Sequence, residues 1–98
     1  MPQPEADKNT ATKKVTLLVQ NRLGLHARPA ALFVQAANRF KSDIEVQKGK
    51  EKVNGKSIMG IMTLAAGRGS QITIRATGPD AVKAITELTN LVRGDFGE

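Results

Sequence analysis

The chain has 98 residues, of which 40% are hydrophobic, so it has the length and apolar content of a single folded domain. It contains no cysteine, which excludes disulfide bonds and thiolate chemistry, and its single histidine without clustered carboxylates argues against any bound metal. Fifteen Lys and Arg against nine Asp and Glu give a formal charge of +6, which favours acidic partners without choosing among nucleic acid, anionic lipid and protein.

The N-terminal segment, residues 1–13, is polar, contains two prolines and shows no periodicity. We expect it to be a flexible tail, with the folded domain occupying residues 14–98. No stretch has the pattern of a secretory signal or of a membrane span. The expected location is therefore the cytoplasm, without membrane insertion.

The first half of the domain alternates between strand and helix patterns. Residues 15–19 are β-branched and aliphatic, which predicts a first strand, and a loop that contains Gly24 follows over 21–25. Residues 27–40 carry apolar side chains at helical spacing, and Pro29 is compatible only with the first turn of a helix. Residues 44–47 and 51–54 are expected to pair as a hairpin around a turn at 48–50.

The second half contains two further helices and one strand. Ser57 precedes an apolar run and Gly67 follows it, which predicts a short helix over 58–66 between these two caps. Residues 71–76 alternate as in a half-buried strand, and 81–93 form the clearest amphipathic helix, with Gly94 at its end. The order β-α-β-β-α-β-α predicts an α+β fold with an antiparallel sheet covered by helices on one face.

The only histidine, His26, falls immediately before the first helix. Backbone N–H groups at a helix N-terminus lack partners within the helix, and the dipole adds positive charge there, so this position favours a bound phosphate group. Arg28 lies two residues further and offers a planar set of donors for phosphoryl oxygens. A histidine at a helix start is also often only a cap or a solvated side chain, so this pattern alone leaves both interpretations open.

Two motifs carry a resemblance to a known family. Residues 23–31 (LGLHARPAA) resemble the active-site signature of HPr, the histidine-containing phosphocarrier family of the bacterial phosphoenolpyruvate-dependent phosphotransferase system (PTS). Residues 54–60 (NGKSIMG) resemble the regulatory-serine segment of that family, and the spacing of the two motifs also matches. The resemblance covers residues 14–93. It implies an open-faced β-sandwich of four antiparallel strands, ordered 1-4-2-3, under three helices.

The resemblance also implies a role for each matched residue. His26 would take up the phosphoryl group on Nδ1, Arg28 would steady it, and Ser57 would be phosphorylated by an ATP-dependent kinase. Ser57 is equally a good helix N-cap, and the two roles are compatible. A partner-binding surface is implied at the other matched positions, which are Ala27, Ala31, Gln35, Lys56, Ile58, Met59 and Met62.

A helix as short as the one predicted over 58–66 cannot bury apolar residues on all sides against one sheet. We expect an inward set of three residues, Ile61, Leu64 and Ala65. The outward set is then Ile58, Met59 and Met62. Exposed, flexible methionine suits a weak docking surface that adapts to several partners.

The partners implied by the resemblance are Enzyme I as phosphoryl donor, enzyme II A components as acceptors, and an HPr kinase/phosphorylase acting on Ser57. It implies a monomeric carrier for sugar uptake, without a cofactor and without independent enzymatic turnover. Residues 91–98 look more like the nitrogen-regulatory branch of the family, which leaves the pathway open.

Two other classes of protein compete with a phosphocarrier. A small basic nucleic-acid-binding domain would fit the charge of +6, but the chain has no Tyr or Trp for base stacking. A ligand-sensing βαββαβ domain would fit the element order, but it would not need the His-Ala-Arg-Pro string.

Overall fold

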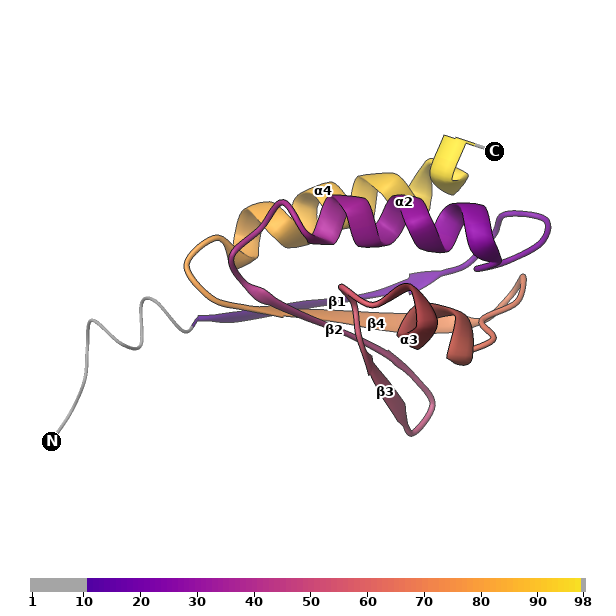
Figure 1. Cartoon of the computed structure of the whole chain (residues 1–98), viewed down its shortest axis with the longest axis horizontal. Helices are drawn as coiled ribbons and strands as arrows, with labels where there is room; N and C mark the ends of the chain where they lie inside the picture. Colours follow the sequence, from indigo (N-terminus) through magenta and orange to yellow (C-terminus); the bar gives the residue numbers. More distant parts are fainter. Residues whose placement is uncertain (1–10, 98) are drawn as a thin grey trace, which may run out of the picture.

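The computed structural model describes residues 11–97, and its elements follow the predicted order (Figure 1). The strands are β1 (Thr12–Leu18), β2 (Asp43–Lys48), β3 (Glu51–Asn54) and β4 (Gln71–Thr77). The helices are α2 (Ala27–Ala37), α3 (Ile58–Thr63) and α4 (Ala81–Arg93), followed by a 3-10 turn, η1 (Asp95–Gly97). Within residues 11–97, no helix is both long enough and apolar enough to cross a bilayer.

The four strands form one antiparallel sheet in the order β1-β4-β2-β3. β4 comes last along the chain but lies between β1 and β2, and it pairs with β1 from Thr12↔Thr77 to Leu18↔Gln71. α2 and α4 lie side by side over one face of the sheet, and α3 packs against α2 and β3 (Figure 1). The predicted α+β sandwich and its strand order are confirmed.

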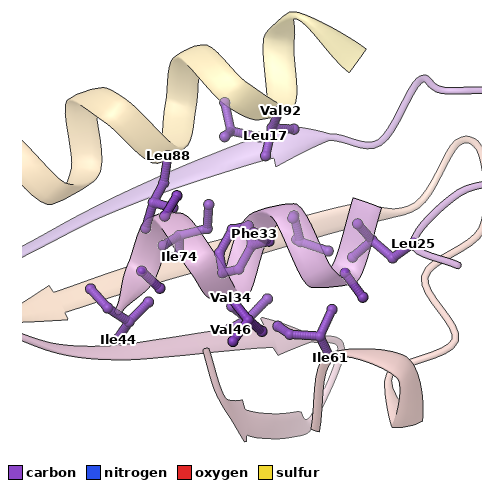
Figure 2. Close-up of a cluster of buried hydrophobic side chains, with 14 of the residues drawn as sticks. Leu17, Leu25, Phe33, Val34, Ile44, Val46, Ile61, Ile74, Leu88 and Val92 are labelled. Carbon is purple, nitrogen blue, oxygen red and sulfur yellow. The ribbon is translucent and has the colours of Figure 1, made fainter. Parts of the chain in front are cut away.

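The core fills the space between the helices and the covered face of the sheet. Alternation along β4 buries Ile72, Ile74 and Ala76, and helical spacing buries Phe33 of α2 and Leu88 of α4 opposite them (Figure 2). Burying one such Leu, Ile or Phe side chain contributes about 1.5–3 kcal/mol to stability. All three phenylalanines of the chain are buried. No aromatic ring is therefore exposed over residues 11–97.

β1 begins earlier than the sequence pattern predicts. The pattern indicates a strand over 15–19, whereas Thr12 and Lys13 also pair with β4, and the hydroxyl oxygens of Thr12 and Thr77 lie 3.0 Å apart. A domain boundary at residue 14 would therefore leave out two residues of the sheet. The rest of the predicted tail, residues 1–10, and residue 98 lie outside the described residues.

α2 and α3 are both shorter than predicted. α2 ends at Ala37, and a tighter turn follows in which the N–H of Phe40 donates to the carbonyl of Ala37 at 3.2 Å, so Phe40 is buried without being helical. α3 ends at Thr63, and the backbone reverses at Ala65, whose φ is 50°. The predicted cap at Gly67 and the predicted inward position of Ala65 are wrong, because the reversal leaves Ala65 exposed.

Asp80, the N-cap of α4, ties the loop that follows α2 to the start of α4. Its carboxylate accepts hydrogen bonds from the Ser42 hydroxyl at 2.6 Å and from the backbone N–H groups of Lys41 and Ser42 at 2.9 and 3.0 Å. These bonds, the Ser42 hydroxyl first, lower the pKa of Asp80 from 3.8 to about 2. Gly78 allows the close approach, since a Cβ there would lie 2.6 Å from the Ser42 hydroxyl oxygen.

Candidate functional site

His26 occupies the N-cap position of α2 in an extended conformation, with φ −81° and ψ −170°. Its carbonyl accepts the first helical hydrogen bond, from Ala30 at 3.0 Å, while its half-buried side chain makes no capping hydrogen bond. The N–H groups of Ala27 and Arg28 have no acceptor in a preceding helical turn, and Pro29 has no N–H to leave unsatisfied. The predicted position of His26 at a helix N-terminus is confirmed, and this end suits an anion.

The loop that leads into His26 is fixed by backbone contacts. The side-chain amide of Asn21, a buried residue, donates to the carbonyl of Gly24 at 2.6 Å, and the N–H of Leu25 donates to the carbonyl of Ala66 at 2.9 Å. Gly24 has φ 67°, and a Cβ there would lie 2.5 Å from the Ala66 oxygen. Only glycine meets both requirements at low cost, so this residue sets the approach of the loop to the turn after α3.

The predicted partner-binding residues of α2 form one stripe. Ala27, Ala31 and Gln35 are four residues apart and so lie on the same side of the helix. Ala27 and Gln35 are exposed and Ala31 is half-buried. Gln35 also lines a groove of about 660 Å³ between α2 and α4, which the Arg39–Glu87 ion pair spans with an N···O distance of 2.8 Å.

α3 presents its predicted apolar surface to solvent. Ile58, Met59 and Met62 are 44%, 74% and 41% exposed, while Ile61 and Leu64 are buried. The predicted division of these five side chains is confirmed. Because α3 packs against α2, the exposed apolar residues lie on the helix that adjoins the one begun by His26.

Ser57 is the N-cap of α3, and its hydroxyl oxygen accepts a hydrogen bond from the N–H of Gly60 at 3.0 Å. The predicted capping role is confirmed. The far end of α3 leads to Ala66, which contacts Leu25, so the length of the six-residue helix, about 9 Å, separates Ser57 from the loop of His26. Ser57 directly precedes Ile58 and so borders the exposed apolar residues of α3.

Lys56 has an internal partner. Its ammonium donates to the carbonyl of Phe40 at 2.8 Å, which links the start of α3 to the turn after α2. The side chain is half-buried, and its charge remains next to Ser57. A contact between Lys56 and a binding partner stays a prediction.

Leu23 is a surface residue that the sequence motifs leave without a role. It lies three positions before His26, in the loop, and it is 68% exposed. Leu23 and Leu25 are both apolar residues of the same loop, so the sequence does not show which of the two is exposed. In the described part of the chain, no three acidic or histidine side chains lie close enough to hold a metal ion.

A family model described as "PTS HPr component phosphorylation site" matches residues 13–94 of the chain. The chain belongs to the PTS HPr family. The phosphocarrier protein HPr of Neisseria meningitidis is 47% identical over 85 residues, which cover 87% of this chain and 96% of that protein. The crystal structure of an HPr from Thermoanaerobacter tengcongensis matches with a TM-score of 0.85 at 51% identity and covers 88% of this chain and 97% of that one. The predicted family is confirmed.

A second HPr structure from Thermoanaerobacter tengcongensis is described as a dimer. It matches with a TM-score of 0.72 at 51% identity, and covers 88% of this chain and 99% of that one. Dimers therefore occur within the HPr family, and the monomer implied by the sequence resemblance stays a prediction for this chain.

Proposed function

We propose that the chain is a cytoplasmic PTS phosphocarrier in which His26 accepts a phosphoryl group from phospho-Enzyme I and passes it to an enzyme II A component during sugar uptake. The observation that carries the proposal is the position of the chain's only histidine at the N-cap of α2. Membership in the HPr family supports it, as does the name phosphocarrier protein that its Neisseria relative bears.

The transfer requires a nucleophile and a site for the phosphoryl charge. Nδ1 of His26 attacks the phosphorus, the bond from phosphorus to the donor breaks, and the same exchange later moves the group to the acceptor. The N–H groups of Ala27 and Arg28, the helix dipole and the Arg28 guanidinium stabilise the charge on the phosphoryl oxygens. The carrier is regenerated by passing the group on, so it has no turnover of its own.

We assign partner docking to the exposed surface of α2 and α3. α2 supplies Ala27, Ala31 and the polar Gln35, and α3 supplies the apolar residues Ile58, Met59 and Met62, so the surface is small and partly apolar. A carrier must release each partner quickly, and a small, partly apolar interface suits brief binding. The formal charge of +6 steers the carrier towards acidic partner faces and raises the association rate.

Ser57 is proposed as a second phosphorylation site, modified by an HPr kinase/phosphorylase. A phosphate at the N-terminus of α3 would interact favourably with the helix dipole, so it would leave the fold intact. Its negative charge would lie beside Ile58 and Met59, on the docking surface.

The sugar branch and the nitrogen-regulatory branch of the family differ in their acceptors. The sequence of the C-terminal segment, residues 91–98, favours the nitrogen branch. One residue of this segment, Phe96, is buried in the core. The branch is tested by offering the phosphorylated chain to enzyme II A proteins of both branches and measuring which one takes up the label.

A nucleic-acid-binding role has less support, because the three phenylalanines are buried and leave no ring for base stacking.

The test of the phosphocarrier role is His26→Ala. With Enzyme I and labelled phosphoenolpyruvate, the wild-type chain should acquire a label that acid removes, as expected for phosphohistidine. His26→Ala should acquire none while keeping its circular dichroism spectrum and melting temperature. Lys83→Ala, which changes an exposed side chain of α4, should be labelled like the wild type. Continued labelling of the His26 variant would refute the assignment.

A further inference from the structure

Lys48, the last residue of β2, has its ammonium group at the C-terminus of α3. Its Nζ donates hydrogen bonds to the carbonyl oxygens of Leu64 and Ala65, both at 3.2 Å. Carbonyl groups at the end of a helix lack partners within the helix and carry partial negative charge. The lysine ammonium donates hydrogen bonds to these carbonyl groups and so favours the termination of α3 at this position.

The turn that Lys48 binds is unfavourable for its own sequence. Ala65 has φ 50°, in the left-handed region that residues with a Cβ rarely adopt. Its N–H donates to the carbonyl of Met62 at 3.0 Å, which completes the reversal after α3. Because Ala65 does not prefer this conformation, the contacts that hold the turn must come from elsewhere, and Lys48 supplies two of them.

The same turn holds the loop of His26. The carbonyl of Ala66, the next residue, accepts the hydrogen bond from the N–H of Leu25 at 2.9 Å. The two segments are also in close contact at Gly24, where a Cβ would lie 2.5 Å from the Ala66 oxygen. His26 directly follows Leu25, so a displacement of the turn at 64–66 moves the backbone that carries the imidazole.

We propose that Lys48 is a positioning residue for phosphoryl transfer: it fixes the turn at 64–66, which in turn fixes Leu25 and the orientation of His26. The inference rests on the proposed role of His26 as the phosphoryl acceptor. Lys48 makes no contact with the phosphoryl group in this scheme. It acts through the backbone, and small errors in the geometry of a reacting group slow a transfer strongly.

The test compares three variants at a temperature well below their melting temperatures. Lys48→Met keeps the aliphatic stem and removes the donor, and Lys48→Arg keeps a charged donor. Lys50→Met, in the exposed turn of the same hairpin, makes the same change in net charge and serves as the matched control. The measurements are kcat and KM of phosphorylation by phospho-Enzyme I, hydrogen exchange of the Leu25 amide, and the NMR signals of the His26 ring.

We expect Lys48→Met to lower kcat by about tenfold or more with little change in KM, because docking is intact and the imidazole is misplaced. Exchange at Leu25 should become faster and the His26 ring signals should shift. Lys48→Arg should restore most of the rate, and Lys50→Met should behave as the wild type. A normal kcat in Lys48→Met would overturn the proposal, as would an equal loss in Lys50→Met.

Failure of the proposed function gives a different result. If the wild-type chain takes no label on His26, the phosphocarrier role fails, and the positioning by Lys48 is then decided by Leu25 exchange and the His26 ring signals alone. Unchanged exchange and ring signals in Lys48→Met would overturn the positioning role in that case too.

Discussion

The charge of Arg28 does not stabilise the helix in which it lies. It is exposed at the second position of α2, and a positive charge at a helix N-terminus is unfavourable to the dipole. The position of Arg28 therefore suits binding of an anion at that end and does not stabilise α2. The same end carries His26 as N-cap and the N–H groups of the first turn.

Replacing Arg28 by Ala should slow phosphoryl transfer without lowering the melting temperature. A charge-assisted contact made mainly in the transition state is worth about 2–3 kcal/mol, which corresponds to a rate loss of tens- to over a hundredfold. Transfer kinetics from phospho-Enzyme I measure the effect. Arg39→Ala removes the same charge two residues beyond the other end of α2, and it should react normally although it also breaks the ion pair with Glu87. Equal transfer rates for the two variants would show that Arg28 is only a solvent-exposed surface charge without a part in the transfer.

Replacing Ser57 by Asp should slow phosphorylation of His26 at low salt. Asp is a good N-cap, so the melting temperature should stay unchanged. It carries one negative charge where a phosphate would carry about −1.5 to −2, so it imitates the modification in part. The initial rate is measured at low and high ionic strength, and the defect should shrink with salt because screening weakens exposed charges.

Thr86→Asp, on the exposed side of α4, is the matched control for Ser57→Asp and should react like the wild type at both ionic strengths. Equal rates for the Ser57 variant and the wild type at low salt would reduce Ser57 to a structural cap. A defect that salt does not change would indicate steric disruption of the surface formed by Ile58, Met59 and Met62.

At the scale of elements, the carboxylate of Asp80 joins the loop after α2 to α4. It accepts hydrogen bonds from the two backbone N–H groups and the one hydroxyl of residues 41 and 42, so it holds the end of the α2–β2 connection that precedes β2. Its hydrogen bonds favour the ionised carboxylate, which is why its pKa is low.

Asp80 should make the stability of the fold depend on pH in acid. Its pKa of about 2 in the folded chain lies below the ordinary value of 3.8, so the contribution is present in full well above 3.8 and is lost as the pH falls towards 2. Melting temperatures between pH 6 and pH 2 should fall less steeply for Asp80→Asn than for the wild type. Asp43→Asn, which neutralises an exposed carboxylate of β2, should leave the slope unchanged. If the melting temperatures of the wild type and Asp80→Asn fell equally steeply with pH, Asp80 would not be the source of the acid dependence.

Local chemistry predicts some element ends and not others. Ser57 and Pro29 mark the starts of α3 and α2 because capping and the missing proline N–H act within one turn. The end of α3 has no such mark, since the residue in the left-handed conformation is Ala65 while the nearest glycine in the sequence is Gly67. The contacts at that end come from Lys48 and from Leu25 in the loop of His26, which lie far away in sequence.

Some features of the candidate site can also be predicted from local sequence, and others cannot. His26 and its place at a helix N-terminus follow from neighbouring residues alone. The exposure of Leu23 and the internal bond of Lys56 depend on how distant segments pack, so motif and periodicity do not reveal them. The local pattern also does not predict the pairing of Thr12 and Lys13, because their partners in β4 lie more than 60 positions away in the sequence.

At the scale of the whole molecule, the edge strand β1 bears on oligomeric state. Its free edge offers backbone groups to a second chain, but exposed lysines at 13 and 14 oppose such pairing. We expect a monomer at micromolar concentration, with a mass near 10.5 kDa by light scattering. Replacing both lysines by Val should increase self-association. A wild-type mass of twice that value would contradict the expectation.

The central position of β4 has a consequence for the chain as it is synthesised. Thr12 and Thr77 face each other across the sheet but are 65 positions apart in the sequence. β1 therefore leaves the ribosome long before the strand with which it pairs, and α2, β2 and β3 are also synthesised before the strand at the centre of the sheet. β1 therefore has no partner strand until β4 has been synthesised, near the end of translation. Premature termination before β4 would release a fragment that holds both sequence motifs and no folded carrier.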